Sequence, residues 1–317
     1  MLPVVAVAVR VYSARPMPRL WATLVLTTTC AVAARAHEPP AARVTALEAR
    51  KTNTAADVDI LLQLAQTQRV RGNAKAALVS LEEAWGWQPD DARVLGERGL
   101  AHSALGNDAK ADVDLTAALA ARPQNMAWRL EHARVLARLG RVAEALEAYA
   151  VTQDGKPDVD ALLEHGRLLE RQGRHQDAAR VFHAGVMTAG GAAVLRKAAV
   201  VAYANAGDCA AALRLIRAAP RAGIMVGWMV LEADVLDAQG RSKEATKVRA
   251  AAGQQLAALQ QRRETPDRKA WAAQLAFRAG QVQQAHALLV GLPDVLDAVR
   301  EARAVVQDNA GRWTCAR

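Results

Sequence analysis

The chain has 317 residues, of which 52% are apolar but only 4% aromatic, and its formal charge is +9. Alanine recurs in nearly every stretch of ten residues. This composition favours closely packed helices and argues against a large globular core filled with aromatic side chains.

Residues 17–36 have the features of a secretory signal peptide. A short basic start at Met17-Pro18-Arg19 precedes a mostly apolar run, and Ala34-Arg35-Ala36 supplies a small-x-small cleavage pattern. We predict cleavage between Ala36 and His37, with residues 1–16 as an upstream extension. The chain is then exported, to the periplasm if the organism is a Gram-negative bacterium. An uncleaved amino-terminal membrane anchor is the alternative.

The positive charge is concentrated in the targeting segment. Removing residues 1–36 removes four arginines and no acid, so the formal charge falls from +9 to +5. The remaining basic residues are spread among many acids, so the charge gives little support for nucleic acid binding. No second run in the mature part is long and apolar enough to cross a membrane.

Residues 37–56, which contain Pro39-Pro40, are predicted to form a mobile lead or an amino-terminal cap. Beyond them glycines recur at intervals of 34, 34, 33, 34 and 33 residues, at Gly72, Gly106, Gly140, Gly173, Gly207 and Gly240. Glycine adopts the left-handed conformation that ends a helix, and residues such as Asn73 and Asp208 can cap the next one. Each period is therefore predicted to be a helical hairpin.

A small residue follows every one of these glycines five positions later. These residues are Ala77, Ala111, Ala145, Ala178, Ala212 and Ala245. Four positions further on the first five units have a large apolar residue, whereas the sixth has Arg249. Proline closes the first three units, at Pro89, Pro123 and Pro157. Small residues allow two helices to approach, and proline prevents the second helix from continuing.

This pattern resembles the tetratricopeptide repeat, a helix-turn-helix unit of about 34 residues. The second unit matches at Leu95, Gly99, Gly106, Ala111 and Pro123. The resemblance assigns residues 57–190 to units 1–4, residues 191–264 to the divergent units 5 and 6, and residues 265–317 to a degenerate unit 7, a capping helix and a tail. It implies an all-α, right-handed superhelical solenoid of about seven hairpins.

The resemblance also implies a concave groove, lined by the first helix of each hairpin, that binds a peptide or protein segment. By register its lining is Leu62, Gln66, Leu100, Leu130, Arg134, Leu163, Arg167 and Val201. Arg134 and Arg167 occupy equivalent positions and would suit an acidic or carboxylate-bearing partner. Alternatively, Glu131 and Glu164, three residues earlier on the same helices, neutralise them.

The cysteines and the histidines are the other side chains that could carry chemistry. Cys209 and Cys315 lie about three units apart, near 30 Å in a regular stack, so we expect a buried Cys209 and an exposed tail cysteine unless the tail folds back. His132 and His165 repeat with the units and are predicted to pack structurally, without a shared metal.

No phosphate loop, nucleophile elbow or zinc-protease motif is present in the sequence. We therefore expect a non-catalytic interaction scaffold of the cell envelope, without cofactor, serving assembly or secretion. Two alternatives remain: a self-associating array that uses its convex face, and an accessory subunit of an envelope enzyme complex.

Overall fold

The computed structural model describes residues 40–51, 57–151, 158–188, 190, 192–219, 225–260, 264–308 and 313–315. The predicted signal peptide, its cleavage site at Ala36 and His37, and Pro157 lie outside the described residues. Within the described ranges every regular element is a helix, which confirms the all-α fold class.

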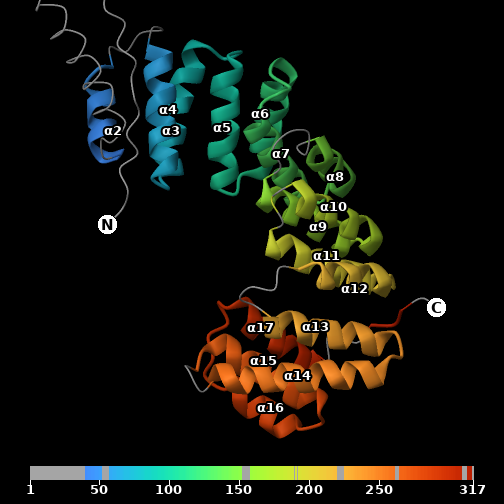
Figure 1. The fold of residues 1–317 in the computed structure, drawn as a ribbon. Coiled ribbons are helices and arrows are strands. Elements are labelled where there is room, and N and C mark those ends of the chain that lie inside the picture. The colour runs from blue at the N-terminus through green and yellow to red at the C-terminus, as the bar shows by residue number, and fades with distance from the viewer. Residues whose placement is uncertain are drawn as a thin grey trace, which may run out of the picture. The chain divides into compact units, whose positions relative to one another are not determined.

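The chain divides into two compact units, Met1–Asn107 and Asp108–Arg317. Unit 1 contains α2 (Pro40–Glu48), α3 (Val58–Val70), α4 (Ala74–Trp87) and α5 (Ala92–Ala104). Unit 2 contains α6 (Asp108–Ala121), α7 (Met126–Arg138), α8 (Val142–Val151), α9 (Val159–Arg171), α10 (His175–Thr188), α11 (Ala193–Asn205), α12 (Cys209–Arg217), α13 (Met225–Ala238), α14 (Ser242–Gln260), α15 (Pro266–Arg278), α16 (Val282–Leu289) and α17 (Asp297–Asp308). Figure 1 labels these helices.

The glycines of the sequence period lie at the turns inside the hairpins. All six have a positive φ, between 71° and 83°. At the first of them, the N–H of Asn73 donates to the carbonyl of Gln68 at 2.9 Å, which closes the end of α3. The Asn73 side chain then accepts a hydrogen bond from the Ala76 N–H and caps α4. The period therefore marks the points at which the chain reverses.

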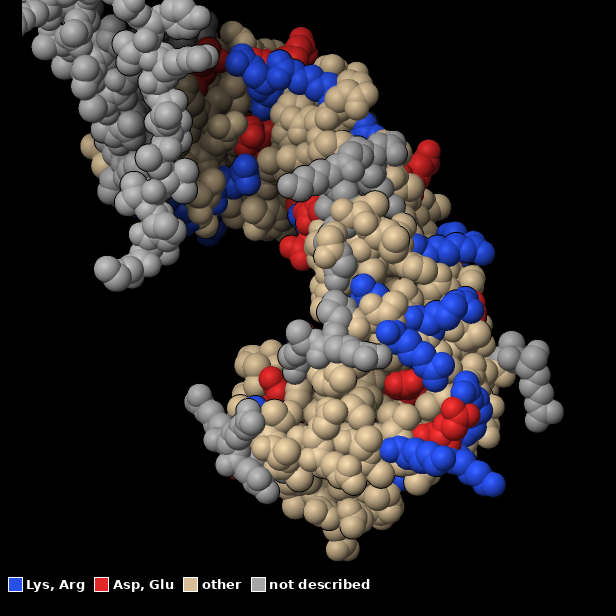
Figure 2. All heavy atoms as spheres, in the orientation of Figure 1, with Lys and Arg blue, Asp and Glu red and all other residues tan. Residues whose placement is uncertain are grey.

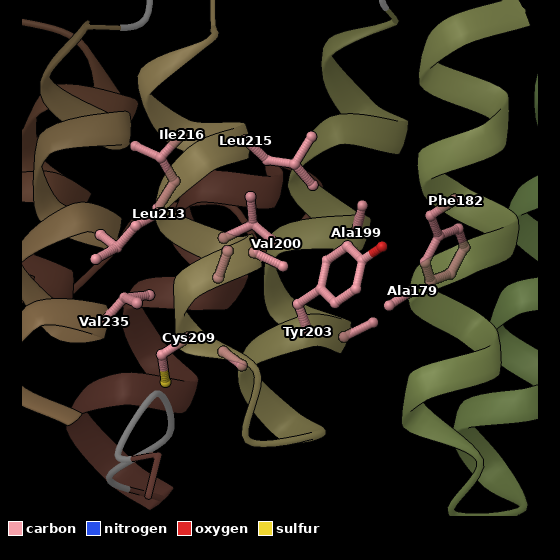
Figure 3. Packing of buried hydrophobic residues seen from close by; sticks show 14 of the residues in the cluster. Ala179, Phe182, Ala199, Val200, Tyr203, Cys209, Leu213, Leu215, Ile216 and Val235 are labelled. Atoms are coloured by element: carbon pink, nitrogen blue, oxygen red, sulfur yellow. The ribbon is translucent and has the colours of Figure 1, made fainter. Parts of the chain in front are cut away.

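The repeated small residues are buried where the helices of each unit meet. Ala77, Ala111, Ala145, Ala178, Ala212 and Ala245 are each 0% exposed. Successive hairpins also pack on one another within each unit, as α10 does on α11. Around these two helices, Phe182, Val200 and Leu215 lie in one continuous apolar cluster (Figure 3). Each hairpin therefore buries its apolar side on its neighbours, and the described residues form several separate apolar clusters along the chain.

The carboxyl-terminal helix returns toward earlier hairpins. α17 packs more on α15 than on α16, and its Val299, Ala302 and Val306 join the core of this last hairpin. Glu301 of α17 forms an ion pair with Lys197 of α11. Beyond α17, the indole N–H of Trp313 donates to the Asn205 side chain at 2.7 Å. The tail thus lies beside the turn between α11 and α12.

The expectation that Cys209 and Cys315 stay unpaired is wrong. They form a disulfide with a Cα–Cα distance of 5.6 Å, although Cys209 is buried as expected. The estimate of about 30 Å assumed that the tail continues along the stack. The return of α17 and the tail removes this separation.

Candidate functional site

The predicted groove residues of unit 1 differ in how much surface they present. Leu62 is only 6% exposed and belongs to the core formed by α3, α4 and α5. Gln66 is exposed, and its amide donates to Glu97 Oε1 at 3.1 Å. Leu100 is half-buried. Gln66 and Leu100 therefore remain available at the surface, while Leu62 supports the fold.

The predicted residues of unit 2 are divided in the same way. Leu163 is 9% exposed and packs in the α9–α13 core, so it is not a surface contact. Leu130, Arg134 and Val201 are half-buried, and Arg167 is exposed. We call the surface carried by Leu130, Arg134, Arg167 and Val201 the first-helix face, because these residues lie on α7, α9 and α11.

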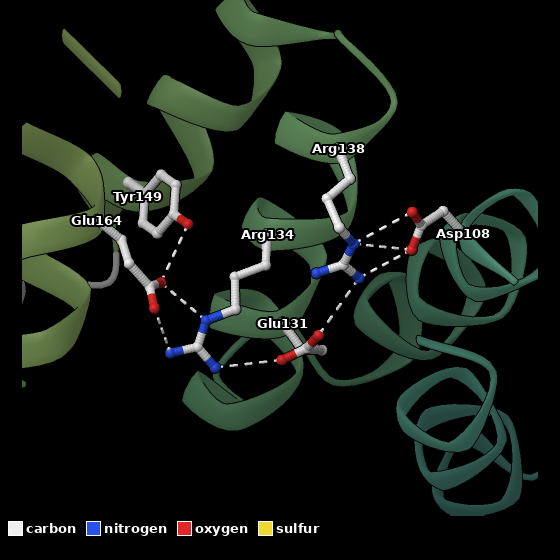
Figure 4. Close-up of polar contacts among 6 residues, drawn as sticks. All are labelled: Asp108, Glu131, Arg134, Arg138, Tyr149 and Glu164. Atoms are coloured by element: carbon white, nitrogen blue, oxygen red, sulfur yellow. Dashed lines mark hydrogen bonds and ion pairs between the residues drawn. The ribbon is translucent and has the colours of Figure 1, made fainter. Parts of the chain in front are cut away.

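Arg134 is held by a network of acids that joins neighbouring hairpins (Figure 4). Its guanidinium forms a bidentate ion pair with the carboxylate of Glu164 on α9, with hydrogen bonds of 2.7 and 3.0 Å, and a third hydrogen bond of 3.2 Å to Glu131. The Tyr149 hydroxyl also donates to Glu164. Hydrogen bonds to Glu164 raise the pKa of Arg134 further above its ordinary value. Arg134 is therefore neutralised, mainly by the next unit and partly by its own helix.

Arg138 extends this network toward α6. Its Nε lies 2.9 and 3.1 Å from the two carboxylate oxygens of Asp108, and Nη2 lies 3.6 Å from Glu131. The network therefore connects α6, α7, α8 and α9. Its members are partly exposed, so it contributes modestly to stability while fixing the register of adjacent helices.

Arg167 lacks the acid that Arg134 has. The contacts Gln66–Glu97 and Arg134–Glu164 join equivalent repeat positions on successive first helices. One unit further on, the position that would face Arg167 is occupied by Ala198. No ion pair of Arg167 is found among the described residues. Of the two equivalent arginines identified in the sequence, Arg134 is therefore neutralised and Arg167 is exposed without an ion pair among the described residues.

The histidines of α7 and α9 have structural contacts. His132 Nε2 lies 2.7 Å from Asp112 Oδ1 and 3.3 Å from the Thr116 hydroxyl. His165 stacks on Tyr149 with ring centroids 5.7 Å apart, and burial lowers its pKa to about 4. In the part of the chain that the structure describes, no three His, Cys, Asp or Glu side chains are arranged to hold a metal. The same residues contain no helix of the length and apolarity needed to cross a membrane.

Unit 2 contains a cavity of about 310 Å³ between α11, α13, α15, α17 and the tail, which the sequence did not predict. Its walls include Val201, Val230, Trp271, Val305 and Trp313. Because α17 and the tail return from elsewhere in the sequence, the repeat period gives no signal for this cavity.

A buried charge cluster lies beside the cavity. Asp234 of α13, itself a wall residue, accepts hydrogen bonds at 3.1 Å from both Nε and Nη2 of Arg278 and at 3.0 Å from Arg249. Asp234 and Arg278 each have a side chain only 7% exposed. The break in the apolar pattern at Arg249 was the one available signal for this cluster, because a buried arginine requires an acid.

Comparison with known proteins finds similar folds among solved structures and no match among family models or curated proteins. The structure of Naa15/Naa10 bound to HypK-THB has 12% identity and a TM-score of 0.51 over 79% of this chain and 39% of that one. A tetratricopeptide repeat protein from Parabacteroides merdae has 20% identity and a TM-score of 0.44, over 67% and 84% of the two chains. YrrB, described as a TPR protein with an unusual peptide-binding site, has 20% identity and a TM-score of 0.46, over 56% and 91%.

These likenesses concern the fold alone. Within the chain itself, hairpins turn at glycines spaced 33 or 34 residues apart. Each hairpin buries an alanine five residues after its glycine and stacks on its neighbours within a unit. This chain has the tetratricopeptide repeat fold.

Proposed function

We propose that the chain is a non-catalytic scaffold that binds a segment of a protein partner on the first-helix face of unit 2. The observation that carries the proposal is the exposed Arg167, which has no ion pair among the described residues. On the same face, Arg134 is neutralised by Glu164 and Glu131. An exposed cation without an ion pair, on the same face as half-buried apolar residues such as Val201, favours a partner with an acidic group and apolar anchors.

The distribution of charge supports a localised contact. On the side of the molecule drawn in Figure 2, basic side chains stand beside acidic ones. A broad basic field would attract polyanions without selectivity, whereas interleaved charges leave recognition to individual residues. A protein segment with one well-placed carboxylate is therefore a more suitable partner than a nucleic acid.

We also propose that the protein works outside the cytoplasm, after removal of residues 1–36. The Cys209–Cys315 disulfide supports this location, because disulfides persist mainly in oxidising compartments. Sequencing the amino terminus of the mature protein tests the location: we expect His37 as the first residue. An intact residue 17 in the mature protein would favour the membrane-anchored alternative.

Binding is tested with a partner captured from envelope extract and then purified. We expect Arg167→Ala to weaken its affinity about tenfold, as the loss of one charge-assisted hydrogen bond would. Arg214→Ala is the matched control, because Arg214 is an exposed arginine on the second helix of its hairpin, α12. Equal affinity of wild type and Arg167→Ala would reject this face as the binding surface. Self-association of the pure chain would instead favour an array.

A further inference from the structure

The cavity beside α17 has a mostly apolar and electrically balanced wall. Trp271, Val230, Leu231 and Val305 supply apolar surface. The wall also contains Lys197 and Glu301, but these two residues pair with each other. The third charged wall residue, Asp234, is already bound by two arginines. The cavity therefore favours an uncharged, apolar occupant.

One polar group on the wall has its hydrogen-bonding capacity free. Gln274 of α15 lines the cavity and is only 7% exposed. Among the described residues nothing forms a hydrogen bond with its amide. An occupant that offers a donor or an acceptor would satisfy Gln274.

The size of the cavity narrows the class of occupant. A volume of about 310 Å³ is at the small end of the range of roughly 300–1,000 Å³ found for ligand sites. It suits one large side chain with its adjoining backbone amide, and it is too small for a bulky cofactor. Val201 belongs both to the cavity wall and to the first-helix face, so a segment bound on that face reaches the cavity.

The tail completes the cavity through covalent attachment. Trp313 forms part of the wall, and Cys315, two residues later, is bonded to Cys209. The hydrogen bond from the Trp313 indole to Asn205 fixes the ring on the same side. Trp313 also packs against the apolar cluster around α11 and α12, and the disulfide adds a covalent restraint to these contacts.

We propose that the cavity is an anchor pocket for one uncharged, apolar side chain of the protein partner. Gln274 bonds the backbone amide next to that side chain, and the Cys209–Cys315 disulfide assembles the pocket by holding Trp313 in its wall. This inference deepens the proposed function and rests on it for the identity of the occupant.

The test uses the oxidised, full mature chain labelled with 5-fluorotryptophan and observed by ¹⁹F NMR. The probe is N-acetyl-phenylalanine amide, and N-acetyl-aspartate amide is its charged counterpart. For so small a probe, a dissociation constant of about millimolar order is expected. We expect saturable shifts of the Trp271 and Trp313 signals with the phenylalanine probe. Trp85 and Trp87 of unit 1, exposed tryptophans outside the cavity, serve as internal references.

Two perturbations of the protein sharpen this test. Gln274→Leu should weaken the affinity for the phenylalanine probe about fivefold to tenfold, the usual effect of losing one hydrogen bond. Gln255→Leu, an exposed position on α14, should leave it unchanged. Reducing the disulfide should weaken binding at least tenfold while the helical circular dichroism is retained.

Three results would overturn the inference: no saturable shift of Trp271 or Trp313, equal binding of the two probes, or undiminished binding after reduction. Because the Arg167 experiment measures the whole partner, it can succeed when the cavity probe fails. In that case the proposed function would stand without an anchor pocket.

Discussion

In two parts of unit 2, different kinds of interaction link one hairpin to the next. From α7 to α10 the hairpins follow the repeat closely, and the polar links between them, such as Arg134–Glu164, are partly exposed. From α13 to α17 the pattern weakens, and the links become a buried charge cluster around Asp234 and an ion pair between α11 and α17. A disulfide attaches the tail as well.

The comparison shows how a repeat array tolerates loss of its pattern. In the regular part, small and large apolar residues at fixed intervals are enough to pack one hairpin on the next. In the divergent part, Arg249 replaces a large apolar residue and depends on Asp234 and Asp237 instead. Buried ion pairs are costly to break, so this part depends on a few specific residues.

The largest effect is expected from Asp234→Ala. Removing this carboxylate leaves Arg278 buried without the acid that it contacts in the structure, beside a second arginine that loses one of its two acids. We expect unit 2 to lose about 3–5 kcal/mol of stability. Chemical denaturation of the mature chain measures this loss. Asp177→Ala, which removes two exposed pairs at the start of α10, is the control and should change stability by less than about 1 kcal/mol.

In the regular part, lowering the pH is expected to reduce stability by nearly as much as Asp234→Ala does. Burial, and secondarily the charge of Arg174, lowers the pKa of His165 to about 4 from an ordinary value of about 6.5. Between these values the unfolded chain binds the proton more strongly, so stability falls as the pH is lowered from 6.5 to 4 and this contribution levels off below 4. The loss amounts to at most about 3 kcal/mol.

Denaturation of wild type and His165→Leu at a series of pH values isolates this contribution. Leucine removes the titrating group while keeping an apolar side chain of comparable size. The wild type should lose more stability than the variant between pH 6.5 and pH 4. Parallel pH dependence of the two proteins would mean that His165 is not buried in its neutral form.

Gly166→Ala tests the close packing of the regular part. A Cβ at Gly166 would lie 2.1 Å from the Phe182 ring, which is itself fully buried. We expect a loss of about 1–3 kcal/mol through overpacking. Gly253→Ala on α14 meets no atom within 4 Å and should stabilise its helix by up to about 1 kcal/mol. Thermal unfolding of the two variants should therefore shift in opposite directions.

The smallest effect is expected from Arg134→Ala. Arg134 and Glu164 have side chains that are 31% and 35% exposed, so water screens their interaction. The variant should lose about 1 kcal/mol or less. A loss as large as that of Asp234→Ala would remove the distinction between the regular and the divergent part.

The hairpins could be predicted from sequence because their signals are local. A glycine such as Gly72 ends its own helix, and Ala77 packs within the same hairpin. The residues that determine each hairpin therefore lie within about 34 residues of one another. The cavity and the disulfide depend on contacts between distant segments. Cys209 and Cys315 are 106 residues apart in sequence, and no periodic pattern records where α17 turns back.

The candidate site was predicted in part for the same reason. Register identified Arg134 and Arg167 as equivalent, but it did not distinguish them. Their difference arises one unit further on, where Glu164 faces Arg134 and Ala198 takes the corresponding place for Arg167. Leu62 and Leu163 were assigned to the groove because the repeat register predicts which side of the helix a residue lies on. It does not predict how deeply that residue's side chain is buried.

The most direct test of the central claim, that the first-helix face of unit 2 is the protein-binding face, is site-specific photocrosslinking. The photoreactive residue p-benzoylphenylalanine replaces Arg171, an exposed residue one turn after Arg167 on α9, or, in a second protein, Lys247, an exposed residue of the second helix α14. Arg167 itself is kept in both proteins. We expect position 171 to crosslink the captured partner and position 247 not to crosslink it. A partner crosslinked from position 247 and not from position 171 would contradict the claim.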